Sequence, residues 1–106
     1  MGKFYTISRN EKRLVELRVD GKTIFPFESQ KIRNHSPTGF EIGYGGDGPS
    51  QLALAILLDL YGQSIALKYY ADFKWKFIAV ADQDGCVISS DDIDLWLKEQ
   101  TDAPKN

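Results

Sequence analysis

The chain has 106 residues, 42% hydrophobic and 26% charged, which predicts one globular domain over 1–100 and a flexible tail over 101–106. The net charge of −2 excludes a strongly basic protein, although residues 1–34 carry a local charge of +4 and residues 35–106 one of −6. The one cysteine, Cys86, excludes an intramolecular disulfide and a cysteine metal cluster.

A β-hairpin is predicted near the start of the chain. Residues 3–7 read as a short strand, and side chains alternate between polar and apolar over residues 13–19. Asp20-Gly21 then separates this segment from the apolar residues 22–25, and Asp-Gly between two such runs is a strong hairpin signal. Pro26 should end the second strand of the hairpin or place it at the edge of the sheet, because proline cannot donate a hydrogen bond to a neighbouring strand.

A buried central helix is predicted after a loop and a glycine-rich turn. Residues 28–38 are polar and predict the loop, and residues 40–44 alternate and predict a short strand. Pro49 is expected at the first helical position. From there to Gly62, which suits a helix end, only Gln51 and Asp59 are strongly polar, so the helix should be buried on nearly every side.

Residues 63–81 fit two patterns. As a strand, residues 73–77 alternate between polar and apolar side chains, so periodicity alone does not decide between helix and strand for residues 73–80. As a helix, one face collects Ala66, Tyr69, Tyr70, Phe73, Phe77 and Val80. The helical pattern is longer, and we predict a helix.

The last part of the chain predicts a turn, a strand and a helix. Asp84-Gly85 turns the chain into a strand over residues 86–88, on which Cys86 should be buried and inert. Ser89 or Ser90 should cap the final helix. Its apolar stripe is Ile93, Trp96 and Leu97.

The glycine-rich turn is the first candidate site. Gly43-Tyr44-Gly45-Gly46-Asp47-Gly48 fits the G-x-G-x-x-G pattern, but the βαβ unit of a dinucleotide fold is missing and no Walker lysine follows. The glycines are explained by a tight turn before the helix. Anion binding at the helix N-terminus and a protein contact through this loop remain open.

Two further candidate residues lie outside this turn. His35 precedes Ser36, but adjacent residues rarely point at each other, so turn chemistry or a buried hydrogen bond explains His35 better than nucleophilic catalysis. Trp75 lies among lysines and falls off the apolar helix face. Packing against the hairpin explains it best, and an exposed contact residue or a stacking platform for single-stranded nucleic acid remains open. The sequence shows no set of a nucleophile, a base and a residue that orients the base, and we expect no enzyme, no cofactor and no metal site.

The segment from His35 to Ala55 resembles the signature of an uncharacterised family of small bacterial and phage proteins. That signature reads HSP-x-GF-E-x-GYGG-x-GP-x-QLALA-x-L, and the resemblance continues through Ala66, Tyr70, Phe73 and Lys74. Members often carry Trp at the position of Ile42 and Ser at that of Asp47. The resemblance implies an accessory protein of a mobile element that works in the bacterial cytoplasm by binding, some such proteins being inhibitors of host defence systems.

The sequence therefore predicts an α+β domain, with a small, mostly antiparallel sheet packed on a buried central helix and two further helices. Its predicted function is a non-catalytic protein-binding module, monomeric or homodimeric, with no membrane contact because no apolar run is long enough to span a bilayer. The alternatives are nucleic-acid binding through Trp75 and small-molecule or nucleotide binding at the glycine-rich turn, where a hydrolase would use His35 and Ser36. The predicted binding residues are Tyr44, Gly45, Gly46, Asp47, Gly48, His35 and Trp75.

Overall fold

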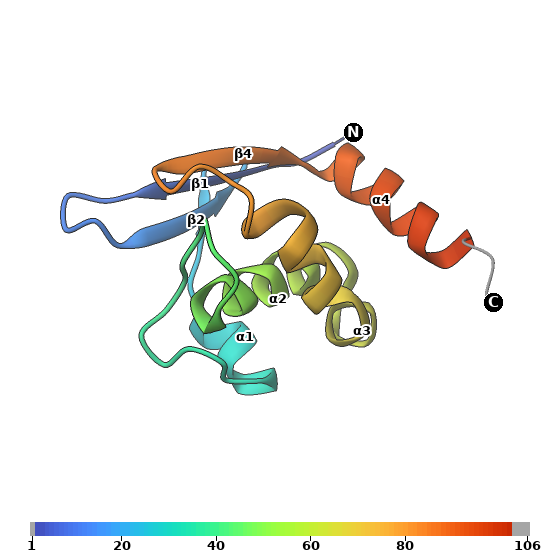
Figure 1. Cartoon of the computed structure of the whole chain (residues 1–106), viewed down its shortest axis with the longest axis horizontal. Helices are drawn as coiled ribbons and strands as arrows, with labels where there is room; N and C mark the ends of the chain where they lie inside the picture. Colours follow the sequence, from blue (N-terminus) through green and yellow to red (C-terminus); the bar gives the residue numbers. More distant parts are fainter. Residues whose placement is uncertain (1, 103–106) are drawn as a thin grey trace.

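The computed structural model describes residues 2–102, and it shows a four-stranded antiparallel sheet with helices packed beneath one face (Figure 1). This confirms the predicted α+β class. The elements in chain order are β1 (Phe4–Arg9), β2 (Val15–Val19), β3 (Lys22–Ile24), α1 (Phe27–Ile32), α2 (Asp47–Tyr61), α3 (Gln63–Phe73), the π-helical turn η1 (Lys74–Ile78), β4 (Gly85–Ser89) and α4 (Ser90–Asp102).

The strands lie in the order β3-β2-β1-β4, so the last strand pairs with the first. The predicted hairpin is confirmed: Val19 pairs with Lys22, and the two turn residues Asp20 and Gly21 have φ of 50° and 84°. Two positive φ values in succession are typical of the type I′ turn, whose twist matches that of the flanking strands. The predicted strand over residues 86–88 is also confirmed, as β4.

The two faces of the sheet have different surroundings. Alternate side chains of the strands, among them Tyr5, Leu17 and Ile88, are buried against the helices. The opposite face stays open, with Phe4 57% and Val87 61% exposed. Figure 1 shows α1, α2 and α3 on the same side of the sheet, which leaves the other side without a helix.

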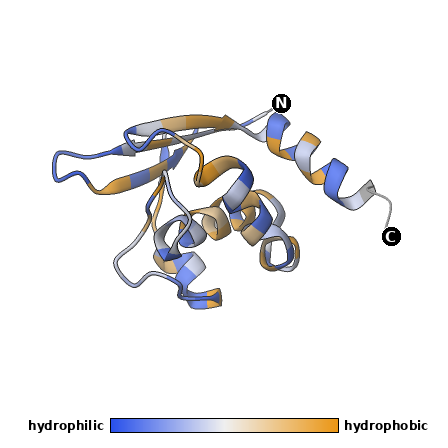
Figure 2. Cartoon of the chain, in the orientation of Figure 1, coloured by the Kyte–Doolittle hydropathy of each residue, from blue (hydrophilic) through white to orange (hydrophobic). Residues whose placement is uncertain are grey.

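Helix α2 is the centre of the core. All residues from 48 to 57 are buried, and Figure 2 shows the hydrophobic colouring of this helix. The prediction placed Pro49 at the first helical position, but the helix begins two residues earlier, at Asp47. Proline fits there because the first N–H groups of a helix have no intrahelical acceptor. Gly62 ends the helix, as predicted, with φ of 89°.

The loop predicted for residues 28–38 is wrong in its first half, where α1 forms. The helix starts after Pro26, whose carbonyl accepts a hydrogen bond from the Ser29 hydroxyl at 2.9 Å. Ser29 is fully buried against α2. This tertiary contact orders a polar segment that has no helical periodicity of its own.

The strand predicted for residues 40–44 is also wrong. Phe40 and Ile42 are buried and Glu41 between them is not, so the alternation is real, but the segment pairs with no strand. Its glycines Gly39 and Gly43 have φ of 113° and 88°, and these bends prevent an extended strand. Gly43 instead donates its N–H to the carbonyl of Ile78 at 3.1 Å.

The helix predicted for residues 63–81 is confirmed as far as Ile78, but its apolar face shifts at η1. Ala79 donates its N–H to the carbonyl of Lys74, five residues back, at 2.8 Å. The wider turn displaces the faces by one residue. Ile78 is therefore fully buried, whereas Val80, predicted on the core face, is 76% exposed.

The C-terminal helix α4 is capped as predicted. The Ser89 hydroxyl accepts the N–H of Asp92 at 3.1 Å, and the stripe of Ile93, Trp96 and Leu97 is buried. The Trp96 ring meets Phe73 and Phe77 edge-on, with centroids 5.6 and 5.9 Å apart. Helix α4 runs to Asp102 and so includes the first two residues predicted as tail; residues 103–106 lie outside the described part. Among residues 2–102, no helix is both long and apolar enough to cross a membrane.

Candidate functional site

The structure brings four of the seven predicted binding residues together at the surface. Tyr44, Gly45 and Gly46 lie just before α2, and Trp75 reaches them from η1. A Cβ atom on Gly45 would collide with the six-membered ring of Trp75, and one on Gly46 would lie 2.6 Å from Cε2 of Tyr44. The two aromatic rings therefore rest directly against glycine backbone. We call these four residues the aromatic surface.

The aromatic surface is exposed. Tyr44 is 48% and Trp75 58% exposed, although both rings have backbone beneath them. The ammonium group of Lys74 lies 4.5 Å from the centroid of the Trp75 ring, a cation–π contact that fixes the ring further. Exposed aromatic rings that are held in place lose little conformational entropy on binding.

Asp47 and Gly48 have different roles. Asp47 is an exposed carboxylate in the first turn of α2, where the helix dipole favours a negative side chain. Gly48 is buried, and a Cβ there would lie 2.5 Å from Cβ of Glu41. Glu41 accepts hydrogen bonds from Arg9, whose Nη2 lies 2.9 Å from Oε1. Side chains of the protein itself therefore occupy the space beside these glycines, which disfavours a phosphate-binding site.

Gln51 holds the segment before the glycine-rich turn. Its side chain is fully buried and makes four hydrogen bonds. The oxygen Oε1 accepts the backbone N–H groups of His35 at 2.7 Å and Ser36 at 3.0 Å. The nitrogen Nε2 donates to Oγ of Ser29 at 2.8 Å and to the carbonyl of Arg33 at 3.1 Å. Every donor and acceptor of this amide is satisfied.

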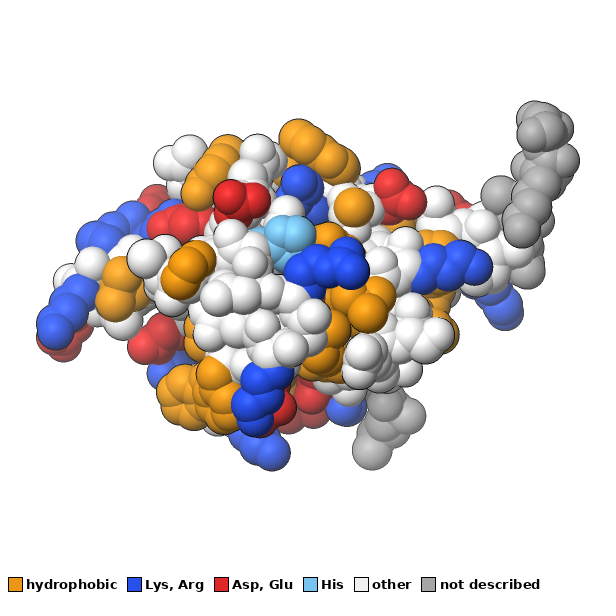
Figure 3. Space-filling view, turned by 90° about the horizontal axis from the view of Figure 1, so that it is seen from below, with side chains coloured by type: hydrophobic (Ala, Val, Ile, Leu, Met, Phe, Trp, Pro, Cys, Tyr) orange, Lys and Arg blue, Asp and Glu red, His pale blue; other side chains and the backbone are white. Residues whose placement is uncertain are grey.

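His35 belongs to another cluster. Its Nε2 lies 2.8 Å from the Tyr70 hydroxyl, which also accepts a hydrogen bond from Arg33 at 3.4 Å. The histidine, pale blue in Figure 3, reaches the surface beside Lys and Arg side chains. Ser36 is buried, with its hydroxyl 3.4 Å from that of Thr38. The two residues of the hydrolase alternative therefore bind different partners.

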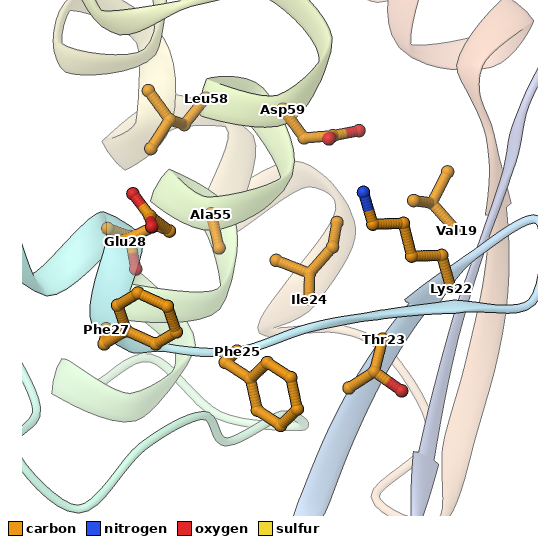
Figure 4. Close-up of a pocket in the computed structure, with 11 residues that line it drawn as sticks. Val19, Lys22, Thr23, Ile24, Phe25, Phe27, Glu28, Ala55, Leu58 and Asp59 are labelled. Carbon is orange, nitrogen blue, oxygen red and sulfur yellow. The ribbon is translucent and has the colours of Figure 1, made fainter.

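A hollow of about 510 Å³ lies at the other end of α2, between that helix, β3 and α1 (Figure 4). Its walls are mainly apolar, and Phe25 and Phe27 are 58% and 49% exposed at its edge. In Figure 4 the Lys22 side chain extends towards the end of the hollow at which Asp59 lies. A volume of this size is within the usual range of small-molecule pockets.

Asp59 connects this end of α2 to the sheet. Its Oδ2 accepts the hydroxyl of buried Tyr5 at 2.6 Å and lies 3.7 Å from the Lys3 ammonium group. Burial and the neighbouring carboxylate raise the pKa of Tyr5 above the usual phenol range. Burial and Asp94 raise the pKa of Tyr61 in the same way, and burial raises that of the half-buried Cys86 thiol. Within residues 2–102, no group of three metal-ligating side chains comes together.

The sequence reasoning missed Gln51 and the hollow. Gln51 carried a signal, since a polar residue in the middle of a helix buried on all sides must find internal partners. The hollow carried none, because its lining comes from two groups of residues, 19–29 and 55–59, and only the packing of α2 against β3 and α1 brings these groups together.

The family model of the family of unknown function DUF6166 matches residues 5–99. The match includes the glycine-rich turn, Gln51, η1 and most of α4. The chain therefore belongs to this family. No curated protein and no solved structure matches the chain significantly.

Proposed function

We propose that this protein is a non-catalytic binding module that engages a protein partner through the aromatic surface. The observation that carries the proposal is the packing of Tyr44 and Trp75 on glycine backbone, which leaves both rings fixed and about half exposed. Tyr and Trp are the residues most enriched among interface hot spots. The sequence resemblance extends the proposal to the partner. We propose that this protein is an accessory protein of a mobile element and that its partner is a bacterial protein, such as a component of a defence system.

Photo-cross-linking from the aromatic surface tests this proposal. A photoreactive phenylalanine analogue at position 75 should cross-link a discrete protein in a bacterial lysate, and Tyr44→Ala should reduce the yield at least tenfold. The matched control carries the analogue at Leu14, which is 56% exposed and immediately precedes β2. Circular dichroism of each variant establishes that it is folded.

Equal cross-linking from positions 75 and 14 would contradict the proposal, because the yield would then reflect exposure alone. Recovery of nucleic acid rather than protein would support the alternative function, in which Trp75 stacks on bases beside Lys74 and Lys76. Such binding should weaken steeply with salt concentration. The Lys74 ammonium group over the Trp75 ring and the glycine beneath that ring restrict stacking, and they favour the protein partner.

The hollow at the Asp59 end of α2 favours a second candidate function: binding of a small apolar molecule that carries an anionic group. The apolar walls would hold the chain of such a molecule, and Lys22, for which the described residues provide no ion-pair partner, would meet its charge. Two carboxylates, Glu28 and Asp59, also line the hollow. Each has a lysine of its own nearby, Lys31 at 3.7 Å from Glu28 and Lys3 at 3.7 Å from Asp59, so Lys22 is left for the charge of a ligand.

Decanoate is a suitable probe of the hollow. It should raise the melting temperature of the protein, and Lys22→Met should reduce this shift at least by half while Lys12→Met, on the exposed β1–β2 turn, leaves it unchanged. Equal shifts in all three proteins, or none up to millimolar decanoate, would contradict this second function without affecting the first.

A further inference from the structure

The two edges of the sheet are protected to different degrees. The β3 edge has three residues, begins with Lys22 and is closed by Pro26 shortly after. Short length, lysine and proline are the usual means by which proteins block an edge strand. The β4 edge, Gly85-Cys86-Val87-Ile88-Ser89, has no charge and no proline. Nothing in the strand itself prevents the addition of another strand.

The register shows which backbone groups of β4 point outward. Ser90 donates its N–H to the carbonyl of Lys3 at 2.8 Å, and the next pairs along are Phe4 with Ser89 and Tyr5 with Ile88. Because hydrogen-bonded and non-hydrogen-bonded pairs alternate in an antiparallel ladder, Ile88 and Cys86 bond to β1, whereas Ser89, Val87 and Gly85 direct their backbone groups away from it.

Some of these outward groups already have partners. The N–H of Gly85 donates to the carbonyl of Asp82 at 3.1 Å, and the Ser89 carbonyl faces the first turn of α4, which this residue caps. Four groups remain without a partner among the described residues: both backbone groups of Val87, the N–H of Ser89 and the carbonyl of Gly85. An antiparallel strand centred opposite Val87 would bond to all four.

The charges at both ends of this edge are acidic. Asp82 and Asp84 lie before the strand, and Asp91 and Asp92 lie after it, all exposed. Arg13 pairs with Asp84 at 2.6 Å and balances one of these charges. A second copy of the chain, paired antiparallel about Val87, would place its own Asp91 and Asp92 next to Asp82 and Asp84. Repulsion between these carboxylates disfavours such a dimer.

We propose that the β4 edge binds an extended segment of a protein partner as a fifth strand of the sheet, with uncharged β-branched residues in its middle and lysine or arginine at both ends. The middle residues would pack beside exposed Val87, and the basic ends would meet the two acidic groups. Main-chain hydrogen bonds would supply affinity, as in other complexes formed by strand addition. This surface is separate from the aromatic surface, and its test does not depend on the function proposed above.

A synthetic peptide, Lys-Lys-Thr-Val-Thr-Val-Thr-Lys-Lys with blocked ends and a fluorophore, serves as the probe. Its affinity for the whole protein is measured by fluorescence anisotropy, and the amide exchange of Val87 and Ser89 by NMR. Val87→Pro removes the central outward N–H, and an edge strand tolerates proline where the N–H faces solvent. Leu95→Ala is the matched control, because Leu95 and Val87 are both 61% exposed.

The expected result is slower amide exchange at Val87 and Ser89 on binding, an affinity at least tenfold lower for Val87→Pro, and no change for Leu95→Ala. The same peptide with glutamate in place of lysine should also bind at least tenfold more weakly at low salt. Equal affinity for Val87→Pro, or slowed exchange in β3 instead of β4, would overturn the proposal. Self-association of the protein that Val87→Pro abolishes, without peptide binding, would assign the edge to a dimer and overturn it too.

Discussion

Helix α2 carries Gln51 near its beginning and Asp59 near its end, and the surroundings of these two polar side chains differ in how completely they are enclosed. Gln51 is fully buried, and its amide makes four hydrogen bonds to the segment around His35. Asp59 is partly exposed, bonds to Tyr5 and Lys3, and lies beside a hollow of about 510 Å³. The Gln51 end fixes the shape of the chain that leads to the aromatic surface, whereas the Asp59 end leaves space for another molecule.

The largest expected effect comes from Gln51→Leu. This substitution keeps the approximate size of the side chain but removes the hydrogen bonds of Gln51 to two backbone N–H groups, one carbonyl and the Ser29 hydroxyl. The free energy of unfolding should fall by about 3 kcal/mol, measured by urea denaturation. Gln63→Leu, at an exposed position of α3, is the control and should change it by less than about 0.5 kcal/mol. Similar losses for both variants would refute the special role of the Gln51 end.

Gly48→Ala tests the close packing at the same end of α2. The new Cβ would lie 2.5 Å from Cβ of Glu41 and 3.1 Å from the Glu41 backbone nitrogen, so the backbone must move. We expect a loss of about 2 kcal/mol in the free energy of unfolding. In Gly45→Ala the atoms nearest to the new Cβ belong to the Trp75 ring, so the substitution displaces this side chain from the backbone beneath it and does not move the backbone. It should cost less than about 1 kcal/mol while shifting the indole N–H resonance of Trp75. Equal losses would show that the aromatic surface is as rigid as the core.

At the Asp59 end, Tyr5→Phe removes one hydrogen bond to a carboxylate and should lower the free energy of unfolding by about 1.5 kcal/mol at neutral pH. The pH dependence has a definite sign. Because the folded-state pKa of Tyr5 is raised, its contribution is complete below about pH 10 and is lost as the pH rises further. Wild-type stability should therefore decrease above pH 10, and Tyr5→Phe should decrease less steeply, with Tyr61 supplying the remainder. Parallel pH profiles of the two proteins would contradict this assignment.

The smallest effect is expected from Phe27→Ser at the edge of the hollow. The ring is 49% exposed and stacks on Phe25, with centroids 6.3 Å apart, and the Lys31 ammonium group lies 5.2 Å from its centroid. The free energy of unfolding should change by less than about 1 kcal/mol, measured by urea denaturation. Binding of decanoate, by contrast, should weaken if the hollow is a ligand site. A loss as large as that of Gln51→Leu would mean that the Asp59 end is part of the core and not an open surface.

Much of the fold was predictable where local chemistry decides structure. Asp20-Gly21 fixes a hairpin turn, an apolar segment between glycines fixes a central helix, and Ser89 caps the last helix. Of the candidate site, Tyr44, Gly45, Gly46 and Trp75 were named from the sequence and lie together. The packing of Trp75 against the hairpin that the sequence favoured is wrong, because its ring lies over Gly45 and is 58% exposed. His35 was named as well, but its ring bonds to Tyr70, and Gly48 is a buried packing position.

What the sequence by itself determined about this protein was therefore the α+β class, the hairpin, the buried helix and the cap of the last helix, because each follows from residues near one another in the chain. Tertiary structure decided the rest. Helix α1 forms because Ser29 is held by Gln51, and residues 40–44 stay out of the sheet because Gly39 and Gly43 bend the chain. The hollow beside Asp59 and the open edge of β4 depend on which elements pack together, and contacts between residues distant in sequence leave no local pattern to read.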